Sequence, residues 1–438
     1  MTLQFDNVLG APRPWEAPLT ALEKGVPALQ APLPLDQVAT QKWNILAEDV
    51  PLPVAILRER ALRANSAWMR GYIEQTGVSI APHGKTSMAP ALYDLQISDG
   101  AWAITVSTPQ HFAVAREFGF KRIFMANQLI GRRGIANVID GLKASPDLAF
   151  YCLVDDTANV AALARAVRER GLGRPLNVLV ELGFEGGRTG CRSLEAALQV
   201  AHAVAEEADA LNLAGVEGFE GLLRNDGAPE ILVQVNALLD GMVTLAETAD
   251  REGLFGDGEV LLSAGGSSYY DLVTTKLSAA KLSRAFRVLI RSGCYITHDS
   301  HMYVRARDAL ARRDPALAAT GNLEPALEVW AYVQSRPEPC KAIVGFGKRD
   351  ASYDDPPIGL KWFRPGLHDK PQPLPPGHIV QRLNDQHCHL EIPAQSPLLV
   401  GDMLGFGISH PCLTFDKWRV MHLVDEDYLV TGSIRTYF

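Results

Sequence analysis

The sequence predicts an α/β protein, in which a (β/α)8 TIM-type barrel is followed by a C-terminal antiparallel β domain. Short apolar runs alternate with amphipathic segments of helical period from Val54 to about Thr297. Eight such runs over roughly 250 residues match the size of a closed barrel. From Leu323 onward, alternating runs without comparably long helices indicate a smaller antiparallel sheet. Because periodicity does not show closure, an open doubly wound sheet stays an alternative for the first part.

Each expected barrel strand is a short apolar run, and the segments between the runs favour helix. Residues 158–170 and 194–208, for example, are rich in Ala, Leu, Glu and Arg, which have high helix propensity. The expected barrel strands lie at 78–82, 103–107, 122–126, 149–154, 177–182, 214–219, 260–264 and 287–291. The expected strands of the second domain lie at 328–333, 341–344, 398–406 and 419–424.

The chain is long enough for two domains. It has 438 residues, 47% of them hydrophobic, which is sufficient for a large core. We expect the barrel over residues 46–300 and the β domain over residues 301–438. The proline-rich segment 1–45 is expected to pack on the β domain.

Charge and apolar patterning exclude several classes of partner. A formal net charge of −8 leaves no basic surface for phosphates, so we expect no nucleic-acid partner, and a small anionic substrate needs a local cationic pocket. No stretch approaches the roughly 20 apolar residues of a membrane helix, so no membrane partner is expected. The first thirty residues lack a signal pattern, which makes a cytoplasmic location the expectation. The six cysteines are scattered, which argues against a disulfide framework and leaves them as thiols or metal ligands.

Lys85 is the first candidate for chemistry. It follows an apolar strand, together with His83, at the end of the barrel where loops converge on one pocket. In a partly desolvated pocket its amine could become a neutral nucleophile able to condense with a carbonyl cofactor. A surface lysine at a strand end is the competing interpretation.

Two further loops could bind anionic groups. The turn Gly265-Gly266-Ser267 follows the seventh strand, where barrels commonly bind phosphate through exposed backbone N–H groups. Arg188 lies between two glycines after the fifth strand and could reach an anionic oxygen. A structural turn and a solvated arginine are the respective alternatives.

Two clusters near the C-terminus carry metal-binding side chains. His410 and Cys412 are two positions apart, so an extended segment would present both on one side, as a zinc site with open positions needs. The cluster His387-Cys388-His389 has the same chemistry, but its alternation points the cysteine away from the two histidines. Ordinary packing is the alternative for either cluster.

Taken together, these motifs resemble the alanine-racemase-like (fold type III) pyridoxal-phosphate enzymes, in the branch that contains D-serine dehydratase (deaminase) and D-threonine aldolase. The resemblance covers most of the chain, and five motifs occur in the family's order. The most specific, Pro82-His83-Gly84-Lys85-Thr86, is similar to the signature whose lysine holds the cofactor as an imine. The other four are 180–190 with Arg188, 263–267 with the glycine-rich turn, 291–295 with Tyr295, and 409–416 with His410 and Cys412.

The resemblance implies a cofactor, a metal and a reaction. Lys85 would bind pyridoxal 5'-phosphate and remove the α-proton of a small D-amino acid. Zinc, or another divalent metal, on His410 and Cys412 would ease departure of the β-hydroxyl, so that D-serine gives a keto acid and ammonia. A homodimer is expected by the same resemblance. Contacts with the cofactor are implied for His83, Lys85, Arg188, Gly265, Gly266, Ser267 and Tyr295.

Departures from the family pattern bear on the reaction. The aldolase branch tends to have aspartate where Cys412 stands, which favours elimination over retro-aldol cleavage, the closest alternative. Phe219 stands where several relatives have tyrosine, so the partner of the pyridine nitrogen stays open. A racemase would leave the metal motif without a role. A noncatalytic carrier of pyridoxal phosphate is the alternative of another class, but such relatives usually lack a second domain like residues 301–438.

Overall fold

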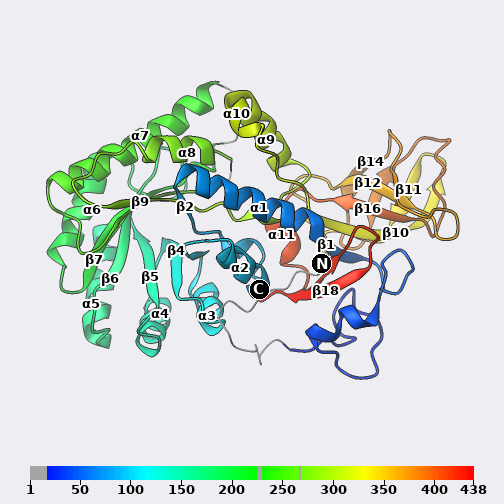
Figure 1. Cartoon of the computed structure of the whole chain (residues 1–438), viewed down its shortest axis with the longest axis horizontal. Coiled ribbons are helices and arrows are strands. Elements are labelled where there is room, and N and C mark those ends of the chain that lie inside the picture. The colour runs from blue at the N-terminus through cyan, green and yellow to red at the C-terminus, as the bar shows by residue number, and fades with distance from the viewer. Residues whose placement is uncertain (1–16, 224–228, 266–267) are drawn as a thin grey trace.

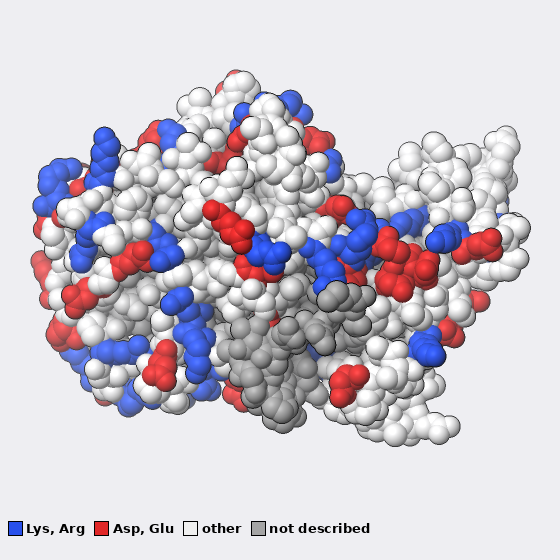
Figure 2. Space-filling view, in the orientation of Figure 1, with Lys and Arg blue, Asp and Glu red and all other residues white. Residues whose placement is uncertain are grey.

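The computed structural model describes residues 17–223, 229–265 and 268–438, which form two lobes (Figure 1). One lobe is a parallel sheet surrounded by helices, and the other is a largely antiparallel sheet. Helix α1 (Glu59–Thr76) runs across the middle of the view between them. On the face shown in Figure 2, Lys and Arg side chains are interspersed with Asp and Glu over the barrel lobe rather than gathered into one basic area.

The first lobe is a closed parallel barrel. Its eight strands follow the order β2-β9-β8-β7-β6-β5-β4-β3. The two ends of this order meet, because Trp102 N–H donates to Ile80 O at 2.7 Å and Thr105 N–H donates to Pro82 O at 2.9 Å. The predicted fold class is therefore confirmed. The strands are β2 (Ser79–Ile80), β3 (Ile104–Val106), β4 (Arg122–Gln128), β5 (Ala149–Val154), β6 (Leu176–Leu182), β7 (Leu211–Gly218), β8 (Val260–Ala264) and β9 (Phe286–Ile290).

The barrel helices begin where side chains can cap them. Thr108, Asp156 and Ser193 each precede a helix and accept hydrogen bonds from backbone N–H groups of its first turn. The segments predicted at 158–170 and 194–208 are helical to within a few residues. After α1, the helices around the barrel are α2 (Pro90–Ser98), α3 (Pro109–Glu117), α4 (Arg132–Ala144), α5 (Thr157–Arg170), α6 (Leu194–Glu206), α7 (Pro229–Arg251) and α8 (Tyr270–Leu277).

Helix α7 corrects one expectation drawn from composition. By length and composition alone it is long and apolar enough to cross a membrane, although no stretch was expected to approach this. In the barrel it contacts β7, α6 and α8, and buried side chains such as Val235, Leu239 and Met242 recur with helical period on one face. The core helix of a globular domain passes the same test, so the composition by itself is weak evidence.

The second lobe is an antiparallel sheet with one parallel pair. Its main path is β13-β12-β16-β10-β1-β17-β18, and β11, β15 and β14 extend from β10. The predicted antiparallel domain is confirmed. The strands are β1 (Val54–Arg58), β10 (Leu327–Glu338), β11 (Lys341–Val344), β12 (Ile358–Phe363), β13 (Gln372–Pro373), β14 (Ile379–Leu383), β15 (Cys388–Glu391), β16 (Met403–Gly407), β17 (Val420–Val424) and β18 (Val430–Arg435).

Strand β1 belongs to the second lobe although it lies within the range expected for the barrel. It pairs antiparallel with β10 and parallel with β17. Four of its residues, 54–57, are buried, so its pattern is a continuous apolar run. A strand buried in either sheet would have the same continuous apolar pattern, so periodicity alone does not identify the strands that pair with β1. The second sheet is therefore built from both ends of the described chain.

A helical segment connects the two lobes, and the N-terminal segment packs on the second sheet. Helices α9 (Met302–Arg313) and α10 (Pro315–Ala318) lie beside α8, and Arg313 contacts Asp271 at 2.9 Å. Both helices fall inside the range expected for the β domain. At the other end, Leu19, Val26 and Val38 form one core with residues of the second sheet. Short 3-10 helices lie in this N-terminal segment at Leu35–Gln37 and Ala39–Gln41.

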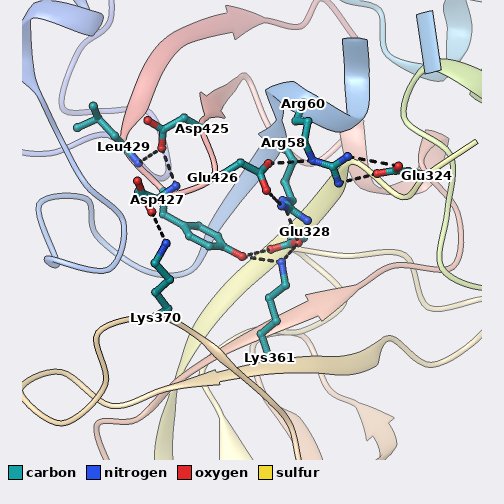
Figure 3. A network of polar contacts seen from close by, with 11 residues as sticks. Arg58, Arg60, Glu324, Glu328, Lys361, Lys370, Asp425, Glu426, Asp427 and Leu429 are labelled. Atoms are coloured by element: carbon teal, nitrogen blue, oxygen red, sulfur yellow. Dashed lines mark hydrogen bonds and ion pairs between the residues drawn. The ribbon is translucent and has the colours of Figure 1, made fainter. Parts of the chain in front are cut away.

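A polar network ties β1 and the start of α1 to the second sheet (Figure 3). At its centre is Glu328, which has only 3% of its surface exposed. Its carboxylate accepts hydrogen bonds from Lys361 Nζ at 2.5 Å and from the Tyr428 hydroxyl at 3.2 Å. Arg58 adds an ion pair with Glu426 at 2.8 Å. Because these groups come from four separate strands or turns, the network holds β1 in its place.

Replacing Glu328 with alanine is expected to destabilise the fold by roughly 3 kcal/mol, because Lys361 loses its buried partner. The matched control is Glu324→Ala, since the Glu324–Arg60 pair is exposed and contributes at most about 1 kcal/mol. Urea unfolding of both variants measures the two losses. Equal losses would contradict a central role for Glu328.

Candidate active site

A cavity of about 360 Å³ lies where the carboxyl ends of the barrel strands face the second lobe. Its walls include residues that follow six barrel strands, together with His410 and Cys412. Six of the predicted site residues line it together: His83, Lys85, Arg188, Gly265, His410 and Cys412. Gly266 and Ser267 lie outside the described residues. The structure thus brings the expected lysine and the expected metal-binding pair to one place.

Lys85 is presented by a tightly packed turn. It lies in the short 3-10 helix Gly84–Thr86, and the Tyr93 hydroxyl donates to Gly84 O at 2.7 Å. A Cβ at Gly84 would lie 2.7 Å from the Tyr93 ring, so only glycine allows this approach. Burial lowers the pKa of Lys85, and the nearby cations Arg188 and Arg291 lower it further. The amine is therefore more available in its neutral, nucleophilic form than a surface lysine.

Two buried nitrogens beside Lys85 have no hydrogen-bond partner among the described residues. They are His83 Nδ1 and Arg291 Nε. Burial, with Lys85 nearby, holds the pKa of His83 well below its usual value, so this imidazole is neutral. Unsatisfied buried polar groups are costly, and a bound polar ligand would remove that cost. The site therefore offers donors and acceptors to an aromatic heterocycle such as pyridoxal.

Arg291 was not assigned a role from the sequence, although it ends the eighth expected strand. It forms a buried ion pair with Glu217 and donates to the Ser263 hydroxyl. Burial raises the pKa of Glu217 to about 8, against the opposing effect of Arg291. These interactions hold the guanidinium at the floor of the cavity. The only signal in the sequence was a charged residue at the end of an apolar strand.

Arg188 lies above the Phe219 ring, with 4.5 Å from its guanidinium carbon to the ring centroid. Its loop is held by Arg192, which donates to the carbonyl oxygens of Thr189 at 2.7 Å and Gly187 at 3.0 Å. The Arg188 side chain lines the cavity close enough to Lys85 to affect its pKa. It is placed to meet an anionic oxygen of a ligand.

Gly265 shapes the end of the cavity at which phosphate was expected. Its N–H donates to the buried Glu220 carboxylate at 3.1 Å, so this amide is already used within the protein. A Cβ at Gly265 would lie 2.6 Å from the Phe219 ring. The glycine is thus required by close packing. Ser268, on the far side of the two residues not described, also lines the cavity.

His410 and Cys412 enter the cavity from the second lobe, at the start of the short helix α11 (Cys412–Phe415). His410 Nδ1 lies 2.8 Å from an Asp354 oxygen, and the Ser409 hydroxyl donates to the other oxygen at 2.8 Å. Contact with the Cys412 thiol, then with Asp354, raises the pKa of His410 to about 9. A carboxylate on Nδ1 is the arrangement that orients the opposite ring nitrogen toward a metal.

The donor set fits zinc with open positions. Contacts with Cys294 and His410 hold the pKa of the Cys412 thiol well below its usual value, which favours the thiolate that metals bind. Within the part of the chain that is described, no three His, Cys, Asp or Glu side chains surround a common point. His410 and Cys412 by themselves would leave positions on the metal open, and an open position is what a catalytic zinc site needs for water or substrate.

Tyr295 and the second histidine–cysteine cluster lie elsewhere. Tyr295 is buried in the wall of a neighbouring cavity of about 30 Å³. Tyr303, at the start of α9, lines the main cavity instead. No motif in the sequence indicates it, because its segment lies within residues 301–438, the range expected for the β domain. In the other cluster, Cys388 is buried in β15 and His389 contacts the Asn384 side chain at 2.5 Å, away from the cavity.

Comparison with known proteins supports the same family on separate grounds. Residues 326–424 match the family described as "Putative serine dehydratase domain". The chain is 26% identical over 313 residues to 3-hydroxy-D-aspartate aldolase of Paracoccus denitrificans (strain Pd 1222), which covers 70% of this chain and 74% of that one. It is 26% identical over 399 residues to D-threo-3-hydroxyaspartate dehydratase of Delftia sp. (strain HT23), covering 88% and 96%.

Solved structures have the same fold. The crystal structure of D-threonine aldolase from Filomicrobium marinum superposes with a TM-score of 0.72 at 22% identity, over 89% of this chain and 95% of that one. A cysteine-to-alanine mutant of D-threo-3-hydroxyaspartate dehydratase, in the metal-free form, has a TM-score of 0.67 at 20% identity, over 90% and 99%. In fold and in sequence the chain is therefore similar to the alanine-racemase-like, fold type III class of pyridoxal-phosphate enzymes, in the branch of D-serine dehydratase, D-threonine aldolase and 3-hydroxyaspartate dehydratase.

Proposed function

We propose that the protein is a pyridoxal-phosphate- and zinc-dependent lyase that removes the β-hydroxyl of a small β-hydroxy-D-amino acid. D-serine is the simplest such substrate, and a keto acid and ammonia are its products. One observation carries the proposal: the amine of Lys85 and the metal-binding pair His410 and Cys412 line the same cavity. The similar proteins from Paracoccus and Delftia, both named for a hydroxyaspartate, support a β-hydroxy-D-amino acid as the substrate class.

Pyridoxal phosphate, when bound, supplies an aldehyde for the substrate amine and a ring that accepts charge from the α-carbon. Lys85 would hold it, and His83 and Arg291 would contact its ring from the cavity floor. Arg188 would meet an anionic oxygen. The phosphate would lie near Ser268, at the end of the cavity lined by the residues that follow β8. This assigns Arg291, rather than the expected Tyr295, to the cofactor.

Lys85 is also suited to proton transfer. Its lowered pKa makes the neutral amine accessible, so Nζ can take the α-proton of a bound substrate. Arg188 and Arg291 keep cationic charge near the substrate carboxylate and the departing proton. A zinc ion on His410 and Cys412 would supply a Lewis acid for the β-oxygen. Asp354 orients His410 for that role.

Retro-aldol cleavage is the second candidate. It is favoured by the likeness to 3-hydroxy-D-aspartate aldolase, and it needs the same lysine and metal pair. Elimination is preferred because this chain has a cysteine at position 412, whereas the resembling aldolases tend to have aspartate there. The products separate the two reactions: keto acid with ammonia, or glycine with an aldehyde.

Purified protein mixed with pyridoxal phosphate should attach it covalently to Lys85. Borohydride reduction and peptide mass spectrometry would locate the attachment, and Lys85→Ala should abolish it while the exposed control Lys370→Ala should not. Because burial lowers the pKa of Lys85, the attachment rate should level off at a pH below about 10.4, the usual value for lysine. Attachment that survives in Lys85→Ala would end the proposal.

Incubation with D-serine should release pyruvate and ammonia, and with D-threonine the corresponding keto acid. A chelator should reduce turnover strongly and added zinc should restore it, because the β-hydroxyl is a poor leaving group without a Lewis acid. Cys412→Ala should reproduce the chelated behaviour. Glycine with an aldehyde as the products would favour the aldolase, and turnover unaffected by the chelator would remove the metal from the mechanism.

Asp354→Asn is expected to weaken zinc binding by roughly 10- to 100-fold, because the carboxylate no longer fixes the His410 ring. The matched control is Asp355→Asn, since the Asp355 side chain is exposed and its carboxylate forms an ion pair with Arg305 at 3.6 Å. Competition with a chromogenic chelator measures both affinities in the absence of substrate. Equal affinities in the two variants would show that Asp354 does not position His410.

A further inference from the structure

Cys294 and Cys412 bring two thiols into contact at the wall of the cavity. Their sulfur atoms are 3.9 Å apart, although the residues are 118 positions apart in the chain. Cys294 begins the short 3-10 helix Cys294–Ile296 after the last barrel strand, whereas Cys412 begins α11 in the second lobe. The Thr86 hydroxyl lies 3.6 Å from each sulfur. The proposed lyase reaction gives Cys294 no task.

We propose that Cys294 and Cys412 are a site of reversible oxidation, which a peroxide converts into a disulfide that excludes the metal. The disulfide itself follows from the contact between the two sulfurs. Exclusion of the metal rests on the proposed function, because it assumes that Cys412 is a zinc ligand. The two parts can be tested separately.

The chemistry balances with hydrogen peroxide as the oxidant. The Cys412 sulfur attacks one peroxide oxygen, the O–O bond breaks, and the first water leaves with the thiol proton. The sulfenic acid that remains on Cys412 is attacked by the Cys294 sulfur, and a second water leaves as the S–S bond forms. Two thiols lose two electrons and two protons, and one peroxide gains them. For the bond to form, the sulfurs approach by about 2 Å, to the disulfide length of about 2.0 Å.

The position of the pair explains why these two thiols would react together. Cys412 is partly exposed and lines the cavity, so a small oxidant can reach it. Cys294 is buried directly behind it and is placed to capture the sulfenic acid before further oxidation. Cys152, Cys191 and Cys388 are buried elsewhere. No other contact between two cysteine sulfurs is seen among the described residues.

The metal and the disulfide compete for one sulfur. A metal binds the thiolate of Cys412, and a disulfide has no thiolate to offer. Bound zinc should therefore slow oxidation, and oxidation should release zinc. The bond would also connect the last barrel segment to the second lobe across the active site.

The test treats metal-free full-length protein with hydrogen peroxide. After denaturation, the number of free thiols should fall from six to four, and peptide mapping should find residues 294 and 412 linked. Dithiothreitol should restore all six thiols. Protein loaded with zinc should form the link several-fold more slowly and lose zinc as the link appears, measured by mass spectrometry and by a metal-binding dye.

Two variants make the result decisive. In Cys294→Ser, Cys412 should gain oxygen atoms irreversibly, because no second thiol captures the sulfenic acid. The matched control Cys191→Ser, which removes a buried thiol elsewhere, should still form the link. Oxygen atoms added to Cys412 beside a free Cys294 in the unmodified protein would overturn the proposal. If zinc does not change the rate at which the disulfide forms, the disulfide does not compete with the metal, and Cys412 is not supported as a zinc ligand. If the protein proves to lack lyase activity, the disulfide itself is still measured by peptide mapping.

Discussion

The active site depends on contact between two lobes that come from distant parts of the chain. The barrel supplies Lys85, Arg188 and Arg291, and the second lobe supplies His410 and Cys412. Neither set alone contains both a nucleophilic amine and a metal-binding pair. The chemistry therefore requires that the second sheet be held against the carboxyl ends of the barrel strands. Strand β1 and α1 serve that purpose, because consecutive residues pass from the second sheet into the barrel wall.

Cationic side chains are concentrated at the cavity between the lobes, although the chain as a whole is acidic. The chain has a formal net charge of −8, yet Lys85, Arg188 and Arg291 face one cavity. Burial lowers the pKa of Lys85, and the buried ion pair with Glu217 fixes the position of the Arg291 guanidinium. A more reactive amine thus lies beside two guanidinium groups in one cavity. That combination suits a ligand with phosphate and carboxylate groups.

The second lobe contributes a metal-binding pair, oriented by an acidic side chain, to the cavity at which the barrel presents its cationic groups. Asp354 and Ser409 fix His410, and the contacts of Cys412 with Cys294 and His410 lower the pKa of its thiol. Short contacts with Thr86 and Cys294 place that sulfur at the boundary between the lobes. The residues proposed for metal binding, proton transfer and thiol oxidation therefore lie around one cavity, and their spacing depends on how closely the lobes approach.

Much of the fold could be predicted from the sequence, since the period of apolar residues is a local property of each segment. All eight barrel strands and the residues at their carboxyl ends, including Lys85 and Arg188, follow from that pattern. Only the tertiary structure decided the partner of β1, the placement of Tyr303 rather than Tyr295 at the cavity, the position of Arg291 in its wall and the contact between Cys294 and Cys412. These four features depend on which helices and strands pack together. Contacts between residues far apart in the chain produce no periodic pattern in the local sequence, so the sequence alone does not predict them.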